Sequence, residues 1–267
     1  MRIDILTLIP NAFATVFDES ILGAARRQGL IDIRVHSFRE FGEGRHLTVD
    51  DAPFGGGPGM VLKPGPLVTA LRRLRQDGPP APVVGLTPQG TTFTQATAKE
   101  LARLERVILV CGRYEGFDER ILAEFDLQLS IGDYVLTGGE FPAMVVVDAV
   151  SRMIPGTVGR AESVQEDSFY DGTLDHPQFT RPATWEGRTI PGVLLDGHHA
   201  KITDWRRGEA LWRTAAQRPD LFRRLPLTPR DRTLLQGALR TAPAPADSPA
   251  PAFSPARRRG GQASSPV

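Results

Sequence analysis

The sequence RVILVCGRYEGF, residues 106–117, joins a short run of apolar residues to a polar segment that contains two glycines. The β-branched residues of the run predict a buried strand over 106–110, and the glycines predict a loop directly after it. Runs of this kind alternate with helical patterns as far as residue 155. Such alternation is typical of crossover connections, so the expected fold class is α/β, an open parallel sheet with helices on both faces.

The other elements of the sheet region follow the same pattern. We expect strands over 2–8, 31–38, 83–86, 106–110 and 127–131. We expect the first helix to be capped by Asn11 and continued over 20–28, and further helices over 66–75, 94–104 and 140–153. Gly29 is expected to end the helix 20–28, because glycine adopts the left-handed conformation of a helix C-terminus without steric cost.

The sequence changes character after residue 159. Residues 160–175 hold five carboxylates and no apolar period, which predicts an acidic, flexible interdomain linker. Residues 176–240 contain helical patterns over 201–217 and 219–225, and a third that Thr228 and Pro229 open, so they predict a small all-helical domain. Residues 241–267 contain six prolines and almost no large apolar residue, and we expect a disordered tail rich in Pro, Ala and Arg.

Charge is distributed unevenly along the chain, although its net value is only +1. Residues 176–240 carry twelve Lys and Arg against six acidic residues, whereas residues 1–159 and 160–175 are both net acidic. Clustered cations favour a polyanionic partner, because binding to phosphates releases counterions. A solvated helical surface explains the same charge equally well.

Composition also indicates a compartment. The single cysteine, Cys111, excludes an intrachain disulfide and favours a reducing environment. Asp4 and Pro10 interrupt what would be the apolar segment of a signal peptide, and the apolar stretch over 144–147 is far too short to span a bilayer. We therefore expect a cytoplasmic protein without a membrane partner.

Several familiar chemical motifs are missing or incomplete. The glycine cluster over 55–59 lacks the Gly-Lys-Ser/Thr ending of a phosphate-binding loop, so it predicts only a sharply bent or closely approached backbone. Serine between glycines at hydrolase spacing is absent, and His198 and His199 have no third metal ligand at suitable spacing. Cys111 follows an apolar run and is expected to be a core thiol.

Three glycine-containing segments directly follow predicted strands. They cover residues 86–90, 111–116 and 131–140. The carboxyl ends of parallel strands meet at one edge, where open α/β sheets bind ligands. Each segment alone is explained as an ordinary turn, but together they favour a site for a flat polar ligand such as adenosine.

The acidic residues of 160–175 follow closely on Arg152. These carboxylates have a purely structural explanation, since they would solubilise a hinge. A carboxylate on a mobile segment is also able to accept a proton from a substrate, and a nearby arginine stabilises the resulting anion.

Four strings carry a resemblance to a known family. They are VDDAPFGGGPGMVLKP from Val49, CGRYEGFDER from Cys111, SIGDYVLTGGEFPAM from Ser130 and EDSFYDGTLDHPQFTRP from Glu166. Over residues 1–236 the chain resembles the bacterial tRNA (guanine-37-N1)-methyltransferases, S-adenosylmethionine-dependent enzymes of the knotted SPOUT class. The resemblance implies a methyltransferase domain with a deep trefoil knot over 1–159, a tRNA-binding domain over 176–240, and a homodimer whose sites are each completed by the other subunit.

The resemblance also assigns residues to the cofactor and the substrate. The S-adenosylmethionine contacts would be Leu86, Thr87, Pro88, Gly90, Gly112, Tyr114, Glu115, Gly116, Ile131, Gly132, Asp133, Tyr134, Val135, Leu136, Gly138, Gly139 and Pro142. The contacts to tRNA bearing guanosine 37 would be Asp50, Ser163, Ser168 and Arg181. A magnesium ion is associated with some members, and Glu115 is the residue to examine for it, but the sequence does not decide whether a metal takes part.

The chemistry needs a base, because N1 of guanine carries a proton at neutral pH and becomes a good nucleophile only when that proton leaves. Asp167 matches the family's proposed general base, and Arg152 matches the arginine proposed to stabilise negative charge on guanine O6. The sulfonium is already an activated methyl donor, so the protein must align the reactants and remove the proton.

Two positions depart from the family pattern, since Phe54 replaces a common tyrosine and His198 replaces a common asparagine. The sequence also leaves two alternatives to methylation of guanine N1. One is another knotted methyltransferase chemistry, for example methylation of the ribose 2′-hydroxyl. The other is an RNA-binding protein that keeps the fold without catalysis, against which the intact Arg152, Asp167 and cofactor segments argue.

Overall fold

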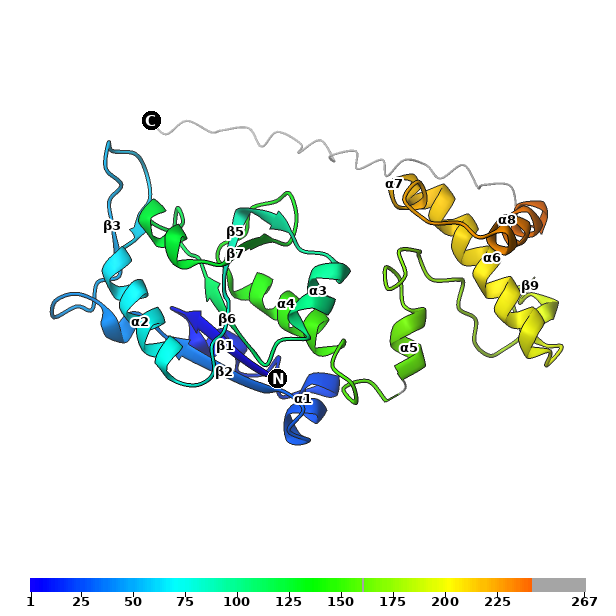
Figure 1. Cartoon of the computed structure of the whole chain (residues 1–267), viewed down its shortest axis with the longest axis horizontal. Helices are drawn as coiled ribbons and strands as arrows, with labels where there is room; N and C mark the ends of the chain where they lie inside the picture. The colour runs from blue at the N-terminus through cyan, green and yellow to red at the C-terminus, as the bar shows by residue number, and fades with distance from the viewer. Residues whose placement is uncertain (160, 242–267) are drawn as a thin grey trace, which may run out of the picture. The chain divides into compact units, whose positions relative to one another are not determined.

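A parallel sheet of five strands forms the centre of the first part of the chain (Figure 1). The computed structural model describes residues 1–159 and 161–241, in two compact units of which the first is Met1–Asp171 and the second begins at Gly172. The strand order is β2-β1-β6-β5-β7, and every pairing is parallel. The strands are β1 (Arg2–Thr7), β2 (Asp32–Ser37), β5 (Val83–Thr92), β6 (Arg106–Cys111) and β7 (Leu127–Ser130). The predicted α/β class with a parallel sheet is confirmed.

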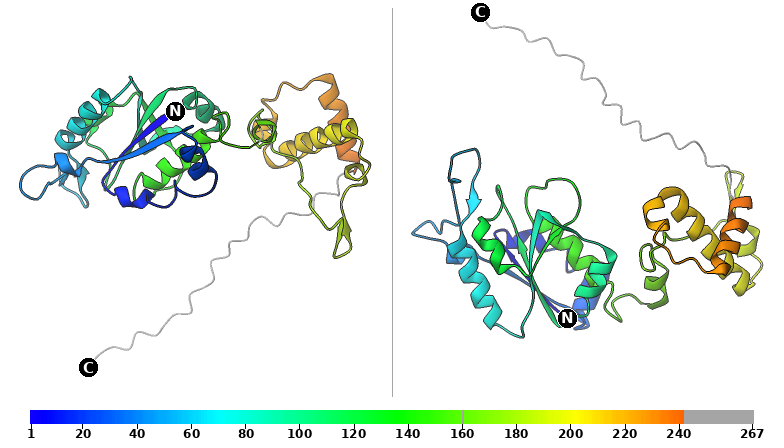
Figure 2. Two further views of the ribbon diagram at one scale, coloured as in Figure 1. Left: turned by 90° about the horizontal axis from the view of Figure 1, so that it is seen from below. Right: turned by 45° about the horizontal axis from the view of Figure 1, so that its top comes forward.

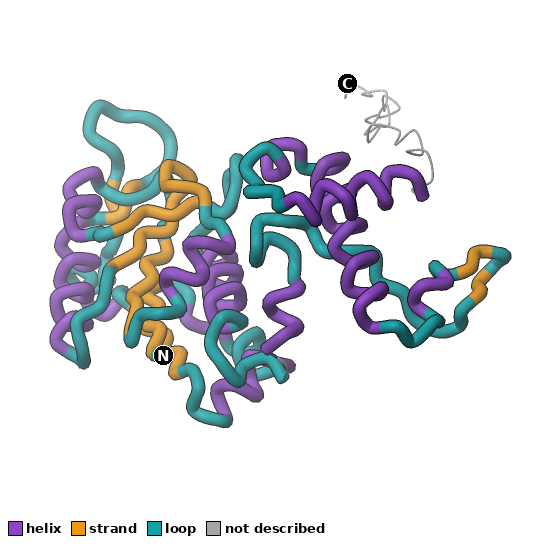
Figure 3. The backbone as a smooth tube through the Cα atoms, turned by 45° about the vertical axis from the view of Figure 1, so that its right-hand side comes forward, coloured by secondary structure: helices purple, strands orange, loops and turns teal. Residues whose placement is uncertain are grey.

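Helices cover both faces of the sheet, as Figure 3 shows. Because successive side chains of a strand point to opposite faces, Ile5 belongs to one core cluster and Leu6 to the other. The first cluster packs against α1 (Ser20–Arg27), α3 (Gln95–Leu101) and α4 (Glu140–Ser151). The second packs against α2 (Pro64–Gln76) and the short 3₁₀ helices η2 (Arg39–Phe41) and η3 (Glu119–Glu124).

The start of the first predicted helix is wrong. Asn11 caps no α-helix but lies inside a 3₁₀ turn, η1 (Pro10–Phe13), and α1 begins only at Ser20. The intervening residues instead bring Phe13 and Phe17 together as a stacked pair in the core, with ring centroids 5.4 Å apart. Ser20, at φ +52°, lies in the left-handed region and interrupts the right-handed helical conformation between Asn11 and the rest of α1.

The end of the same helix is confirmed. Gly29 has a φ of +73°, and its N–H donates to the carbonyl of Arg26. The N–H of Leu30 donates to the carbonyl of Ala25, which completes the Schellman arrangement expected at a glycine-ended helix.

Strand β5 is longer than the sequence predicts. It runs to Thr92, although residues 86–90 were expected to form a loop after the strand. The pairing with β7 shifts register between Leu86 and Thr91, so the extra residues bulge out of the ladder before pairing resumes. The segment 86–90 is therefore a bulge within a strand rather than a free loop.

Short elements complete the first unit. A two-stranded antiparallel ribbon joins β3 (Asp50–Asp51) to β4 (Val61–Leu62). Helix α5 (Ala161–Glu166) lies inside the expected linker, a helical segment that the sequence analysis did not predict. In the described ranges, 1–159 and 161–241, no helix combines the length and apolar character needed to cross a membrane.

The second unit contains α6 (His199–Gln217), α7 (Pro219–Phe222) and α8 (Pro229–Thr241), drawn yellow to orange in Figure 2. Thr228 caps α8 as predicted: its Oγ1 accepts from the N–H of Asp231, and the Asp231 carboxylate accepts from the Thr228 N–H. The expectation of an all-helical segment is wrong in one respect, because β8 (Thr184–Trp185) and β9 (Arg188–Thr189) form a small hairpin. Residues 242–267 of the expected tail lie outside the described residues.

Candidate active site

A pocket of about 330 Å³ lies at the carboxyl ends of β6 and β7, beside the bulge of β5. Its wall is built from the three segments that the sequence singled out, those around residues 86–90, 111–116 and 131–140. All of the residues assigned to the cofactor by resemblance line this pocket except Gly90, Asp133 and Pro142. The structure therefore brings the three predicted segments to one place.

Two of these segments are locked together by backbone contacts at Gly139. Its N–H donates to the carbonyl of Gly112 over 2.8 Å. A Cβ on Gly139 would lie 2.6 Å from Cys111 Cα and 2.8 Å from Gly112 N. Only glycine allows this approach, so the glycine content of the segments is a requirement of the pocket wall.

A buried acid, Glu140, connects the wall of this pocket to the sheet. Glu140, the first residue of α4, is 4% exposed and accepts a hydrogen bond from Thr7 Oγ1 at 2.8 Å. Arg113, which lines the pocket, places Nη2 3.4 Å from the Glu140 carboxylate. The pocket wall is thus tied to β1 through two polar side chains.

Cys111 is a core thiol, as expected. It is buried at the end of β6, and burial, with Glu140 nearby, raises the pKa of the thiol well above its ordinary value. A thiol with a raised pKa is a poor nucleophile, so Cys111 acts through packing.

The glycine cluster over 55–59 packs next to Glu115, a residue of the pocket wall. Its four glycines all have positive φ, which explains the residue type. Gly59 packs directly against the Glu115 side chain, and the N–H of Glu115 donates to the carbonyl of Met60 over 2.9 Å. The sharply bent, closely approached backbone that the cluster predicts is confirmed.

The assigned residues outside the wall have other positions. A Cβ on Gly90 would lie 2.5 Å from the Leu129 backbone nitrogen, so Gly90 permits the close pairing of β5 with β7. Pro142 lies in the first turn of α4. Sequence reasoning missed further lining residues, most of which lie in or next to the same three segments without a motif of their own: Gln89, Arg113, Phe117, Glu119, Leu122, Leu129, Ser130 and Thr137.

The assigned base and its arginine form an ion pair. Arg152 follows α4 and donates through Nη2 to a carboxylate oxygen of Asp167, which follows α5. Both side chains remain partly open to solvent, at 34% and 41% exposure. Neither residue lines the 330 Å³ pocket. Within one chain, the two halves of the expected site are therefore separate.

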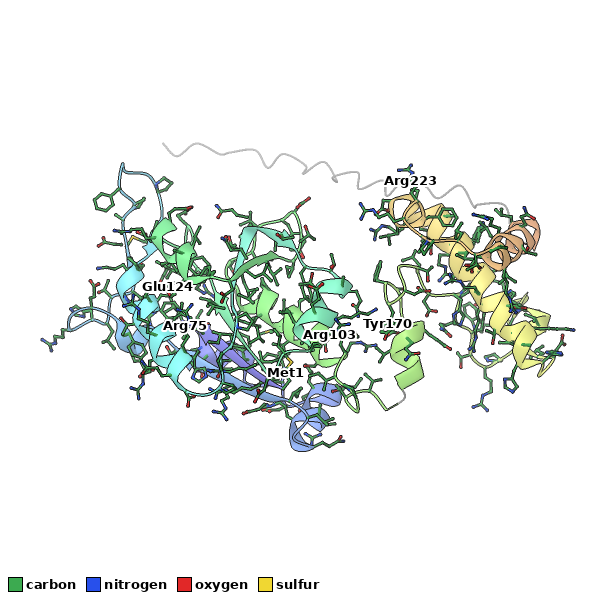
Figure 4. The ribbon with its side chains drawn as sticks, viewed as in Figure 1. Met1, Arg75, Arg103, Glu124, Tyr170 and Arg223 are labelled. Atoms are coloured by element: carbon green, nitrogen blue, oxygen red, sulfur yellow. The ribbon has the colours of Figure 1, made fainter. Side chains whose placement is uncertain are left out.

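The Asp167 segment is attached to the sheet domain by Lys99 of α3. The Lys99 ammonium donates to the carbonyl of Tyr170 and lies 3.4 Å from the centroid of the Tyr170 ring. The N–H of Tyr170 in turn donates to the carbonyl of Asp167 over 3.2 Å. Tyr170 and Arg103, both labelled in Figure 4, line a cavity of about 400 Å³ beside Arg152.

The residues assigned to tRNA are spread along the chain. Asp50 lies in β3, Ser168 follows Asp167 directly, and Arg181 is an exposed residue of the second unit. The side chain of Ser163 lies outside the described residues.

Of the two departures, Phe54 is fully exposed, and His198 precedes α6 without a side-chain capping bond. Among the side chains that the structure describes, no group of three or more His, Cys, Asp or Glu is arranged to hold a metal ion.

Comparisons with known proteins agree on one family. The family model described as tRNA (Guanine-1)-methyltransferase TrmD matches residues 1–224. A tRNA (guanine-N(1)-)-methyltransferase of Dehalococcoides mccartyi is 52% identical over 241 residues, which are 90% of this chain and 97% of the relative. An enzyme with the same name from Syntrophotalea carbinolica is 50% identical over 91% of this chain and 98% of its own length. Another, from Geobacillus kaustophilus, is 49% identical over 88% of this chain and 97% of its own length.

Proposed function

The chain belongs to the tRNA (guanine-1)-methyltransferase family, and we propose that it transfers the methyl group of S-adenosylmethionine to N1 of guanosine 37, next to the anticodon of tRNA. It is a tRNA (guanine-N1)-methyltransferase, as are relatives about half identical to it. The observation that carries the finer assignment is the pocket at the carboxyl edge, built from the three segments to which the cofactor is assigned.

The pocket suits the cofactor in size and lining. Its volume of about 330 Å³ lies within the range of small-molecule sites. Glycines expose backbone amides and carbonyls to a polar ligand, while Leu136, which is 38% exposed, offers apolar surface to a flat ring. We assign to it the cofactor residues named from the resemblance. The knot is part of the proposal, and the hydrogen bond between Gly139 and Gly112 supports it by joining the segments after β7 and β6.

Asp167 and Arg152 supply the acid–base chemistry in this proposal. An Asp167 carboxylate oxygen would accept the proton of guanine N1. S-adenosylmethionine held by the pocket residues would supply an activated methyl group, which the freed N1 lone pair would take up as the carbon–sulfur bond breaks and its electrons return to sulfur. Arg152 donates an N–H to guanine O6, where negative charge develops. Their direct contact supports the assignment, because both groups must reach one purine edge. Asp50, Ser163, Ser168 and Arg181 are the proposed contacts to tRNA.

The active enzyme is a homodimer in this proposal. The cofactor pocket of one chain contains neither Arg152 nor Asp167, which supports their delivery by a second subunit. Each of the two equivalent sites would then combine the pocket of one protomer with the ion pair of the other.

Mixing two impaired variants, at an S-adenosylmethionine concentration too low to occupy the Gly139→Ala pocket, tests this arrangement. Asp167→Asn removes the base, and Gly139→Ala distorts the pocket. If the sites are composite, a mixed dimer keeps one intact site. Random exchange then restores about a quarter of wild-type activity, because half of the dimers are mixed and each has one of two sites. The matched control mixes Asp167→Asn with Arg152→Ala, which damage the same half-site and should restore nothing. Failure of the first mixture to regain activity would refute the composite site.

The magnesium ion is a separate proposal. Mg²⁺ is commonly held by one or two carboxylates together with water and substrate oxygens. Glu115 lines the pocket and is exposed, so its carboxylate fits that role. Bound there, the ion would supply positive charge to the cofactor pocket.

We also propose the domain division expected from the sequence, with a catalytic domain over 1–159, a linker over 160–175, a tRNA-binding domain over 176–240 and a tail after it. The separation of two compact units between Asp171 and Gly172 supports a division within the linker.

A further inference from the structure

The second unit contains a cavity of about 420 Å³ whose lining residues all fall within 176–206. Its lining comes from the segment after residue 175, from residues near η4 (Gly192–Leu194) and from the first turns of α6. Nothing in the chemistry proposed above uses this cavity, apart from the tRNA contact at Arg181.

Aromatic rings form one side of the cavity. Phe179 and Trp205 have ring centroids 6.3 Å apart and are tilted by 44°. His176 packs edge-on against Trp205, again with ring centroids 6.3 Å apart, and supports that ring. Phe179 is 48% exposed, so about half of this large apolar side chain is open to solvent. An aromatic face is therefore available to a ligand.

Polar and cationic groups form the rim of the same cavity. Arg181 lines the cavity and is exposed, and the polar residues Gln178 and Thr180 line it as well. The surrounding residues, 176–240, carry the twelve cations against six acids noted above. An aromatic platform beside an arginine in a basic domain is the arrangement by which proteins hold unpaired nucleotides: the ring stacks on the base and the cation contacts the phosphate.

We propose that this cavity binds an unpaired nucleobase of the tRNA anticodon loop, a base other than the guanine that is methylated. The base stacks on Phe179, and Arg181 contacts its phosphate. This inference rests on the proposed function, since it takes tRNA as the substrate. Its consequence is that the second unit reads the loop as single-stranded RNA and contributes to tRNA affinity without taking part in methyl transfer.

Variants of the full-length enzyme at Phe179 test the inference kinetically. Phe179→Ala and Phe179→Leu should raise the KM for tRNA by about 5- to 150-fold, the affinity equivalent of stacking one base on one ring. Neither change should alter kcat or the KM for S-adenosylmethionine, and Phe179→Trp should restore tRNA affinity. Trp185→Ala is the matched control: Trp185 is 57% exposed in the hairpin of the same unit but does not line the cavity, so its removal should leave the KM for tRNA within twofold.

A binding measurement identifies the base directly. Transcripts carrying 2-aminopurine at single anticodon-loop positions should include one, distinct from position 37, whose fluorescence is quenched by the wild-type enzyme and not by Phe179→Leu. An unchanged KM in both Phe179 variants, an equal loss in Trp185→Ala, or the absence of any quenched position would overturn the inference. Absence of methyl transfer by the wild type would instead refute the proposed function, and the quenching would still report on the cavity.

Discussion

Gly139→Ala is a direct test of how the cofactor pocket is built. The backbone of Gly139 has φ −80° and ψ −1°, which alanine adopts without strain, so the effect must come from space alone. The added Cβ would lie 2.6 Å from Cys111 Cα and 2.8 Å from Gly112 N. Both are backbone atoms of the segment after β6, so relief requires the two segments to move apart.

The cost of that movement follows from two terms. Overpacking of a well-packed site costs about 1–3 kcal/mol. Lengthening the 2.8 Å hydrogen bond from Gly139 N–H to the Gly112 carbonyl costs about 1 kcal/mol more. The free variant relieves the clash by opening the pocket, and binding of S-adenosylmethionine must close it again at the cost of most of this free energy. Since each 1.4 kcal/mol is a factor of ten, affinity for S-adenosylmethionine falls by about 10- to 100-fold.

Isothermal titration with S-adenosylmethionine measures the change, and urea unfolding of the same samples shows whether the variant remains folded. Gly112→Ala provides a graded comparison, because its Cβ would meet the Phe117 ring at 3.0 Å and the Leu86 carbonyl oxygen at 3.3 Å, which are longer than the contacts at Gly139. We expect a smaller loss there. Gly192→Ala is the neutral control, since its Cβ meets no atom within 4 Å. Affinity of Gly139→Ala within twofold of wild type would refute the reasoning.

Three further predictions concern stability, positioning and the tail. Asp4→Asn should destabilise the fold by about 3–5 kcal/mol, because it leaves the buried Arg106 without its carboxylate. Burial alone would raise the Asp4 pKa, but hydrogen bonds from His36, Arg2 and Arg106 outweigh it and lower the pKa from 3.8 to about 2. The stability that Asp4 contributes is therefore present above pH 4 and is lost as the pH falls towards 2. Urea unfolding at pH 6 and pH 3 should show that the difference in unfolding free energy between wild type and Asp4→Asn narrows at pH 3, and a constant difference would contradict this. Lys99→Met should lower kcat about tenfold with an unchanged KM for S-adenosylmethionine, because Tyr170 loses its tether; an unaltered kcat would count against that role. Deletion of residues 242–267, beyond the family match, should leave tRNA methylation unchanged, and a large loss of activity would show that the tail is needed.

The sheet and the pocket could be predicted because their signals are local. An apolar, β-branched run such as 106–110 has few alternatives to a buried strand, and glycines directly after it leave the backbone free to approach a ligand. Parallel strands then bring such segments to one edge without further information. Gly29 was predictable for the same reason, since its conformation depends on its own residue type.

Most features that escaped prediction depend on long-range packing. The extension of β5 to Thr92 arises from pairing with β7, which lies far away in sequence. The late start of the first helix has another cause, the left-handed conformation of Ser20, for which a residue other than glycine gives no local signal. The attachment of Tyr170 by Lys99 joins residues 71 positions apart, and no spacing rule connects them.

The location of the transferred methyl group is the most direct test of the central claim. Purified enzyme is incubated with S-adenosylmethionine and an unmodified tRNA transcript that has guanosine at position 37, and the product is digested and sequenced by mass spectrometry. The account predicts 1-methylguanosine at position 37, and no product from a transcript with another base there. A methyl group on a ribose or on a different base, or cofactor binding without any transfer, would contradict it.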